Sequence, residues 1–292
     1  MAKQKSTGIL VSGKQNRKNQ MLSVQSHHIV DVFYFVDNTV SEPVRPRGGR
    51  PKLVRDSEII TLLIWNCLSS TRQRTLKDVF RWALLYHRRD VPNLGTYGAF
   101  VAHCHRLLPQ LVELLGCLLV PAEIQFIDST KLPVCARHRT DRYRVARKLV
   151  GIGKNWQGYW YGFKLHLAIN TDGQISALAF TPADVYDGHV TEQLVRAETK
   201  IVVGDSHYGD RIQREKLKAK GIIVVAPPHW RQKSHLMAEW QQALLYRRAK
   251  IEATFDRLKE HLPLVSSFPR SVNGYLLHYI RILLGYQMEV GF

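Results

Sequence analysis

The chain has 292 residues, 45% of them hydrophobic, which suffices for one large domain plus a smaller one, or for two domains. Its 42 Lys+Arg against 24 Asp+Glu give a net charge of +18, so a polyanionic partner is expected, nucleic acid before acidic lipid. The sequence shows no signal-peptide pattern, no apolar run of about 18 residues and no C-x-x-C pair. We therefore expect a reduced, cytoplasmic protein without a zinc site, a disulfide framework or a membrane span.

The first segments of the chain are polar and basic. Residues 1–20 hold five basic residues and no acidic one, which predicts a flexible tail. Residues 43–52 combine prolines and glycines with arginines, so this run predicts a loop or arm, either solvated or inserted into a DNA groove.

Helical periodicity governs the segment from 56 to 120, with Thr75 as one of the expected N-caps. Together with a helical pattern at 27–40, it predicts a helical N-terminal domain over 21–120. This domain would either read DNA like a helix-turn-helix protein or serve dimerisation and packing, and the pattern leaves both open.

At residue 121 the pattern changes from helical to strand-like. Turn residues 171–173 join two alternating runs and predict an antiparallel hairpin. The expected order is strand, strand, strand, helix, strand, helix, strand, helix, which predicts an α/β domain over 121–292 with one mixed sheet flanked by helices. The expected strands are one within 123–130 that ends at Asp128, 161–170, 173–182, one within 200–209 that ends at Asp205, and 222–228. The expected helices are 189–198, 211–221, 239–262 and a final apolar-faced one within 270–288.

Two of the apolar runs end in an aspartate, Asp128 and Asp205. Each one alone has a plain reading as a turn or cap residue. Side chains at the carboxyl ends of neighbouring strands, however, converge on one crevice. A third carboxylate at the same point requires a cation between them, and the hard ions Mg²⁺ and Mn²⁺ suit such ligands. Combined with the basic charge, this predicts phosphodiester chemistry with two metal ions per active site.

The third carboxylate is expected from the helix predicted at 239–262. Arg248, Glu252 and Lys259 are separated by four and seven residues, so a regular helix carries them on nearly one face. Glu252 would reach the metal ions, while Arg248 and Lys259 would hold DNA phosphates. Asp256, one turn after Glu252, is the rival candidate.

Five sequence blocks within roughly 122–270 carry a resemblance to a known family. In chain order they read FIDSTKLPVC, WYGFKLHLAIN, LAFTPADVYDGHV, VVGDSHYG and RRAKIEATFDRLK. They resemble the DDE transposases of bacterial insertion sequences, which share an RNase H-like catalytic core. Many relatives carry a Tyr-x2-Arg-x3-Glu-x6-Lys signature. Here the arginine, glutamate and lysine match, but Leu245 stands at the tyrosine position, with Tyr246 one residue late.

The resemblance implies a function. Asp128, Asp205 and Glu252 would be the catalytic and metal-binding residues, with Mg²⁺ or Mn²⁺ as cofactor. Such an enzyme cleaves transposon ends and joins the freed 3′-hydroxyl to target DNA, acting on double-stranded DNA in association with the bacterial nucleoid. Since two ends must be held at once, the resemblance also implies a homodimer on DNA. A hydrolytic RNase H-like nuclease and a non-catalytic, transposase-derived DNA-binding protein are the alternatives.

The segment 137–164 is expected to contact the DNA backbone, because it has eight Lys/Arg against one acidic residue. Its aromatic residues either stack on an unpaired base or pack the base of the hairpin. The expected DNA-binding residues are Arg137, Arg139, Arg142, Arg144, Arg147, Lys148, Lys154, Trp156, Lys164, His207, Arg248 and Lys259.

Three further polar residues have structural readings. Asp184 is interpreted as a turn residue and Asp187 as the cap of the following helix, rather than as metal ligands. His166 alternates with core-facing residues, which predicts a position on the hairpin surface or a contact with DNA.

Overall fold

The computed structural model describes residues 9–10, 28–40, 53–69, 72, 74–155, 158–209, 211–227, 237–265 and 269–291. The chain forms two compact units. The first comprises Met1–Ser12 and Leu119–Arg257, and the second comprises Gly13–Leu118 and Leu258–Phe292. Within the described part of the chain, no helix has both the length and the apolar character needed to cross a membrane.

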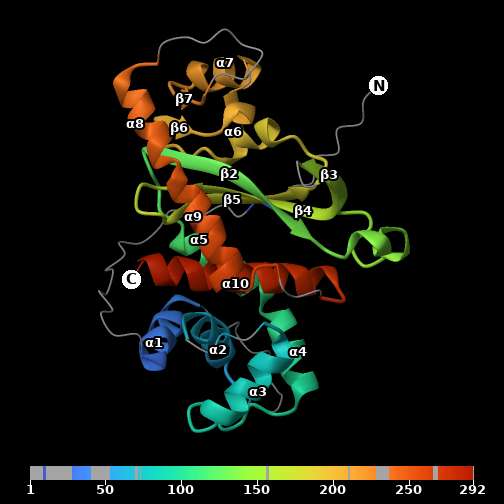
Figure 1. Ribbon diagram of the computed structural model, residues 1–292. Helices are drawn as coiled ribbons and strands as arrows, with labels where there is room; N and C mark the ends of the chain where they lie inside the picture. Colours follow the sequence, from blue (N-terminus) through green and yellow to red (C-terminus); the bar gives the residue numbers. More distant parts are fainter. Residues whose placement is uncertain are drawn as a thin grey trace, which may run out of the picture. The chain divides into compact units, whose positions relative to one another are not determined.

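A mixed β-sheet forms the centre of the first unit (Figure 1). The strand order is β1-β5-β4-β2-β6-β7, with β3 paired to β4. The pairs β1–β5, β5–β4, β4–β3 and β4–β2 are antiparallel, whereas β2–β6 and β6–β7 are parallel. The strands are β1 (Ile9–Leu10), β2 (Ile124–Pro133), β3 (Gly151–Asn155), β4 (Gly158–Ile169), β5 (Ile175–Pro182), β6 (Ile201–Val203) and β7 (Ile223–Val225).

This arrangement confirms the predicted α/β fold, an RNase H-like mixed sheet with helices around it. The predicted hairpin is present as β4 and β5, which join through a turn in which Gly173 has a φ of 93°. Two details differ from prediction. Ile9 and Leu10, inside the expected tail, pair with β5. Between the first two expected strands, where no helix or strand was predicted, the chain forms a 3₁₀ helix, Arg137–Arg142, and β3.

One face of the sheet packs on the short helices that follow β5 and β6. Ile127, Ala168 and Val202 on the strands meet Leu194 of α6 (Thr191–Leu194) and Leu217 of α7 (Arg211–Ala219). Neighbouring residues of a strand point to opposite faces. The side chain after Ile127 therefore points away from this apolar layer, and that alternation sets the direction of the site.

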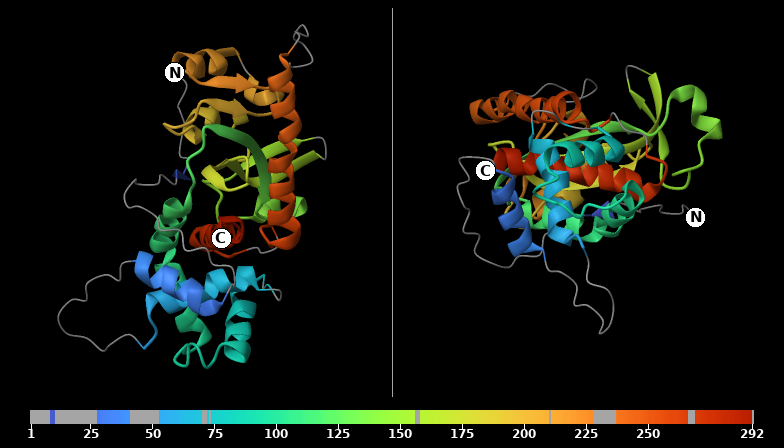
Figure 2. Two further views of the ribbon diagram at one scale, coloured as in Figure 1. Left: turned by 90° about the vertical axis from the view of Figure 1, so that its left-hand side faces the viewer. Right: turned by 90° about the horizontal axis from the view of Figure 1, so that it is seen from below.

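The helix predicted at 239–262 is present but is not regular. It consists of α8 (Glu239–Arg247), α9 (Ala249–Asp256) and a π-helical turn, Arg257–His261. At the α8–α9 junction the Arg248 amide donates to the Leu245 carbonyl at 3.1 Å, a tighter three-residue step. The two helices follow one another beside the sheet (Figure 2, left), and α9 packs against β2. Arg248, at the junction of α8 and α9, is thereby held close to β2.

Helices make up the described part of the second unit. They are α1 (Ile29–Thr39), α2 (Asp56–Leu68), α3 (Leu76–Tyr86), α4 (Tyr97–Arg106), α5 (Leu108–Leu118) and α10 (Val272–Gly291). Thr75 caps α3 as predicted, because its hydroxyl accepts from the Asp78 amide at 3.2 Å. The last helix, α10, packs against α2 and α5. It belongs to this unit, although the α/β domain predicted from the sequence, 121–292, includes it.

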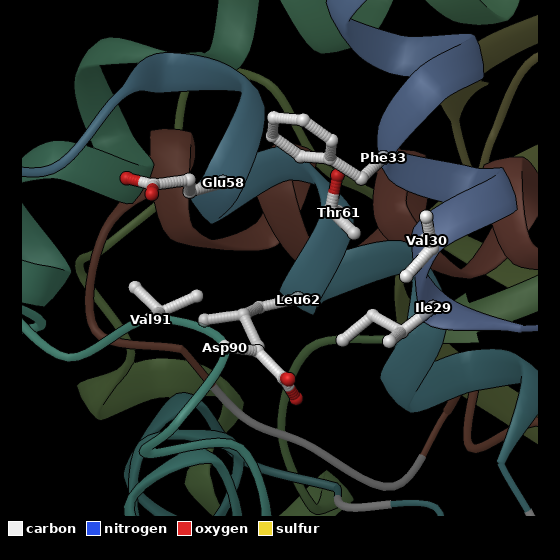
Figure 3. Close-up of a pocket in the computed structure, with 8 residues that line it drawn as sticks. All are labelled: Ile29, Val30, Phe33, Glu58, Thr61, Leu62, Asp90 and Val91. Carbon is white, nitrogen blue, oxygen red and sulfur yellow. The ribbon is translucent and has the colours of Figure 1, made fainter.

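A cavity of about 230 Å³ lies in the second unit between α1, α2 and the turn after α3 (Figure 3). Its wall is mainly apolar, with Phe33 and Leu62 among the lining side chains. Both acidic side chains at the cavity have local partners. Glu58 accepts from a backbone amide at the start of α2 at 2.6 Å, and Asp90 bonds the His87 ring at 2.8 Å. Their carboxylates therefore serve a helix start and a turn.

Candidate active site

Asp128 lies in the middle of β2. The prediction that its strand ends there is wrong, because β2 continues to Pro133 and Asp128 pairs with Leu167 of β4. The parallel neighbour on the other side is shorter. It pairs only with Ile124–Phe126, so the edge of β2 becomes open just before Asp128. The carboxyl group consequently lies where a pairing strand has ended, although its own strand has not.

Asp205 lies in the loop directly after β6, two residues beyond Val203. Phe126 pairs with Val203 in the parallel β2–β6 register, and each aspartate follows its paired residue by two positions. Adjacent strands run about 4.8 Å apart, so this register brings the two carboxylates to one crevice. The backbone and ring nitrogens of His207 meet the two oxygens of Asp205 at 2.9 and 3.0 Å. His207, predicted to bind DNA, is more than half exposed and supports Asp205.

Arg248 connects Asp128 with Glu252. Its guanidinium lies 3.5 Å from the Asp128 carboxylate and forms an ion pair with Glu252 one turn further along the helix. Glu252 is 53% exposed at the side chain, so it remains accessible from solvent. Asp256, the rival acid, is exposed on the next turn. The structure thus places Arg248 between the carboxylates of Asp128 and Glu252.

The Asp128 carboxyl group is electrostatically strained. Its pKa is raised to about 6, mainly by burial and also by the nearby Asp205 and Asp187 carboxylates, against the lowering effects of the Ser129 amide and Arg248. Two of these causes are like charges. An added cation at this point would relieve the repulsion, so the local electrostatics favour cation binding.

Asp187 belongs to the same acidic cluster, which the sequence reasoning missed. Instead of serving as a helix cap, its carboxylate accepts from the Ser129 hydroxyl at 2.8 Å and from the Lys164 ammonium at 2.7 Å. The prediction for His166 is wrong as well. Its ring is fully buried and bonds the Thr181 hydroxyl at 2.8 Å, and burial lowers its pKa to about 4. The sequence does contain a signal for these contacts. Polar residues on an otherwise apolar strand face need hydrogen-bond partners inside the protein.

The donor set is of the chemical kind that a hard divalent cation prefers, since it consists of carboxylates whose mutual repulsion a cation would relieve. Among the residues that the structure describes, no three His, Cys, Asp or Glu side chains converge closely enough to hold a metal ion. The Arg248 guanidinium lies instead between Asp128 and Glu252. The residue types fit Mg²⁺ or Mn²⁺, while their arrangement in this structure is that of an ion-pair network.

Most of the residues predicted to bind DNA lie together on the segment between β2 and β4. Tyr159 of β4 is half-exposed there, with Arg137 and Lys154 over its ring at 5.7 and 5.3 Å from the centroid. Trp156 lies outside the described residues. Lys164 is only 19% exposed and is ion-paired with Asp187, while Lys259 lies in the π-helical turn of the second unit. The exposed cations of the segment are Arg137, Arg139, Arg142, Arg144, Arg147, Lys148 and Lys154.

An RNase H-like sheet with acidic residues at neighbouring strand positions, beside a strongly basic surface, defines a class of nucleic-acid-processing proteins. Comparison with known protein families identifies the family within this class. A profile of the family described as "Transposase DDE domain" matches residues 120–272, more than half of the chain. The chain belongs to this family and is a DDE-type transposase, with DNA as its partner. No curated protein matches it in sequence.

Proposed function

We propose that this transposase cleaves the ends of its DNA element and joins the freed 3′-hydroxyl to target DNA, using Asp128, Asp205 and Glu252 as catalytic residues. The observation that supports the proposal is the parallel register, in which Asp128 and Asp205 each follow the paired residues Phe126 and Val203 by two positions. The ion pairs of Arg248 with Asp128 and Glu252 support the third position.

The three carboxylates would hold two Mg²⁺ or Mn²⁺ ions, which supply charge stabilisation to the attacking and departing oxygens in phosphodiester chemistry. The protein side chains orient the reaction. His207 fixes both oxygens of Asp205, and the Ser129 amide fixes one oxygen of Asp128 at 2.7 Å. Arg248 is placed to exchange its carboxylate partners for a DNA phosphate, with which its planar guanidinium forms bidentate contacts.

The exposed cationic segment between β2 and β4 would bind the DNA backbone. Its seven exposed cations face solvent beside a half-exposed tyrosine, a combination typical of surfaces that track a nucleic-acid strand. Because both ends of an element must be held for joining, we infer a homodimer on DNA that acts in the bacterial nucleoid.

An end-cleavage assay tests the proposal. The substrate is a duplex carrying the sequence that flanks the coding region, incubated with Mg²⁺. Asp128→Asn, Asp205→Asn and Glu252→Gln should each slow cleavage about a hundredfold or more, because each removes several kcal/mol of charge stabilisation. Asp256→Asn, which removes the same charge one turn away, is the matched control and should cleave at the wild-type rate.

Joining is tested separately with pre-cleaved ends and a plasmid target. Strand transfer by the wild-type protein supports the transposase reaction, whereas cutting and release without joining would identify a hydrolytic nuclease. Undiminished cleavage by Asp128→Asn would overturn the assignment of the active site.

A further inference from the structure

A chain of polar contacts lies behind the Asp128 carboxylate, on the other face of β2. The β2–β4 register is regular from Phe126 to Pro133, so Asp128 and Ser129 point to opposite faces. The Ser129 side chain lies on the face covered by α6 and α7, together with His166 and Lys164 of β4. Ser129 nevertheless also contacts Asp128, because its backbone amide donates to the Asp128 carboxylate at 2.7 Å.

Both carboxylate oxygens of Asp187, at the end of this chain away from Asp128, accept hydrogen bonds. One Asp187 oxygen accepts from the Ser129 hydroxyl at 2.8 Å, and the other accepts from the Lys164 ammonium at 2.7 Å. The same ammonium donates to the Val185 carbonyl at 2.8 Å, just before Asp187 in sequence. Lys164 thus fixes the loop after β5 to β4, and Asp187 fixes that loop to β2.

The surroundings of the chain are partly buried. Tyr208 and His166 are both fully buried. Burial, followed by the Asp187, Asp128 and Asp205 carboxylates, raises the Tyr208 pKa well above its usual value, so the phenol stays neutral. The side chains of Lys164 and Asp187 are 19% and 21% exposed. Because both Asp187 oxygens are bonded and most of their surface is covered, the ion pair has limited freedom to move.

We propose that Asp187, ion-paired to Lys164, is a positioning residue that holds Ser129 so that the Ser129 amide aims the Asp128 carboxylate at the cation. The inference rests on the proposed function of Asp128. It assigns Lys164 to this brace and leaves the DNA contact to the exposed cations of the preceding segment. Asp187 touches neither DNA nor the metal in this scheme, and it acts through Ser129 and β2.

The test measures Mn²⁺ binding to the full-length, DNA-free protein by calorimetry. Groups that orient metal ligands typically contribute 10–100-fold to metal affinity. Asp187→Asn and Ser129→Ala should therefore weaken Mn²⁺ binding about tenfold. Cleavage of the flanking-sequence duplex should show a matching fall in kcat and an unchanged KM for DNA. Asp184→Asn is the matched control, because it removes the same charge from the same loop at an exposed position.

The outcomes separate the two proposals. Wild-type Mn²⁺ affinity in both Asp187→Asn and Ser129→Ala, with loss in Asp128→Asn, would refute the brace alone. A lowered melting temperature with unchanged Mn²⁺ affinity would do the same, since it would show a purely structural role. Wild-type affinity in Asp128→Asn would contradict the proposed function itself. If Asp187→Asn fails to fold, Ser129→Ala decides, because it deletes one hydroxyl and leaves the ion pair intact.

Discussion

Replacing Asp128 by asparagine should stabilise the catalytic unit at neutral pH while abolishing cleavage. Burial and like charges hold the Asp128 pKa at about 6, above the ordinary value of 3.8. The native state therefore binds this proton more tightly than the unfolded chain does. The stability contributed by protonation is complete below about pH 4 and is lost as the pH rises through about 6.

The size of the effect follows from the pKa shift. About two pKa units at 1.36 kcal/mol each give an upper value of about 3 kcal/mol in the metal-free protein at pH 8. The Asp128 side chain is 22% exposed, which reduces the expected gain to about 1–3 kcal/mol. Asparagine keeps the shape without the charge, so the gain should appear at pH 8 and vanish at pH 4.

Hydrogen exchange of the β2 and β6 amides in urea, with a chelator present, measures the free energy of opening of this unit alone. This local probe is needed because two units need not unfold together. Asp184→Asn, at an exposed turn position, should change the opening free energy by less than about 0.5 kcal/mol at either pH. Equal or lower stability of Asp128→Asn at pH 8 would refute the reasoning, because the carboxylate would then be no burden to the fold.

Two further results are expected. The double variant Arg137→Ala and Lys154→Ala should reduce the steepness with which log K for DNA binding falls against log salt concentration, by about 1 per lost phosphate contact. Lys200→Ala is the control and should leave this slope unchanged, because Lys200 is exposed but ion-paired elsewhere. An unchanged slope in the double variant would show that DNA does not bind this surface. Gly162→Ala should lower the melting temperature, because its Cβ would lie 2.1 Å from a backbone oxygen of β2 and overpacking costs about 1–3 kcal/mol. Gly98→Ala, which meets nothing within 4 Å and lies in α4, should leave the melting temperature unchanged or raise it.

Two acids of the site, Asp128 and Asp205, were predictable because they follow mainly apolar runs. The runs before Asp128 and Asp205 are nearly all apolar, as a strand covered on both faces requires. Strand ends were less predictable, because the sequence around Asp128 remains compatible with a strand for five more residues. The position of Asp128 is special because its neighbour β6 stops, and a partner strand's length is a tertiary property that the local sequence does not contain.

The helix that carries Glu252 shows where periodicity succeeds and where it fails. A spacing of four residues predicted that Arg248 and Glu252 share one helix face, and in the structure the two side chains form an ion pair there. The extension to Lys259 assumed a regular 3.6-residue turn, but the helix tightens at Arg248 and widens into a π-helical turn at Arg257–His261. The role predicted for Asp187 was wrong for another reason. An aspartate before a short helix looks like a cap, and only the folded sheet brings Lys164 and Ser129 to it.

The distribution of charge around β2 explains how an acidic centre persists in a chain of net charge +18. Four carboxylates, those of Asp128, Asp187, Asp205 and Glu252, face two internal cations, Lys164 and Arg248. When all are ionised, a formal excess of two negative charges remains. The positive surplus lies elsewhere, and its densest exposed run is the segment between β2 and β4. DNA is therefore attracted to one surface while the centre beside it still attracts a cation, which a uniformly basic protein could not achieve.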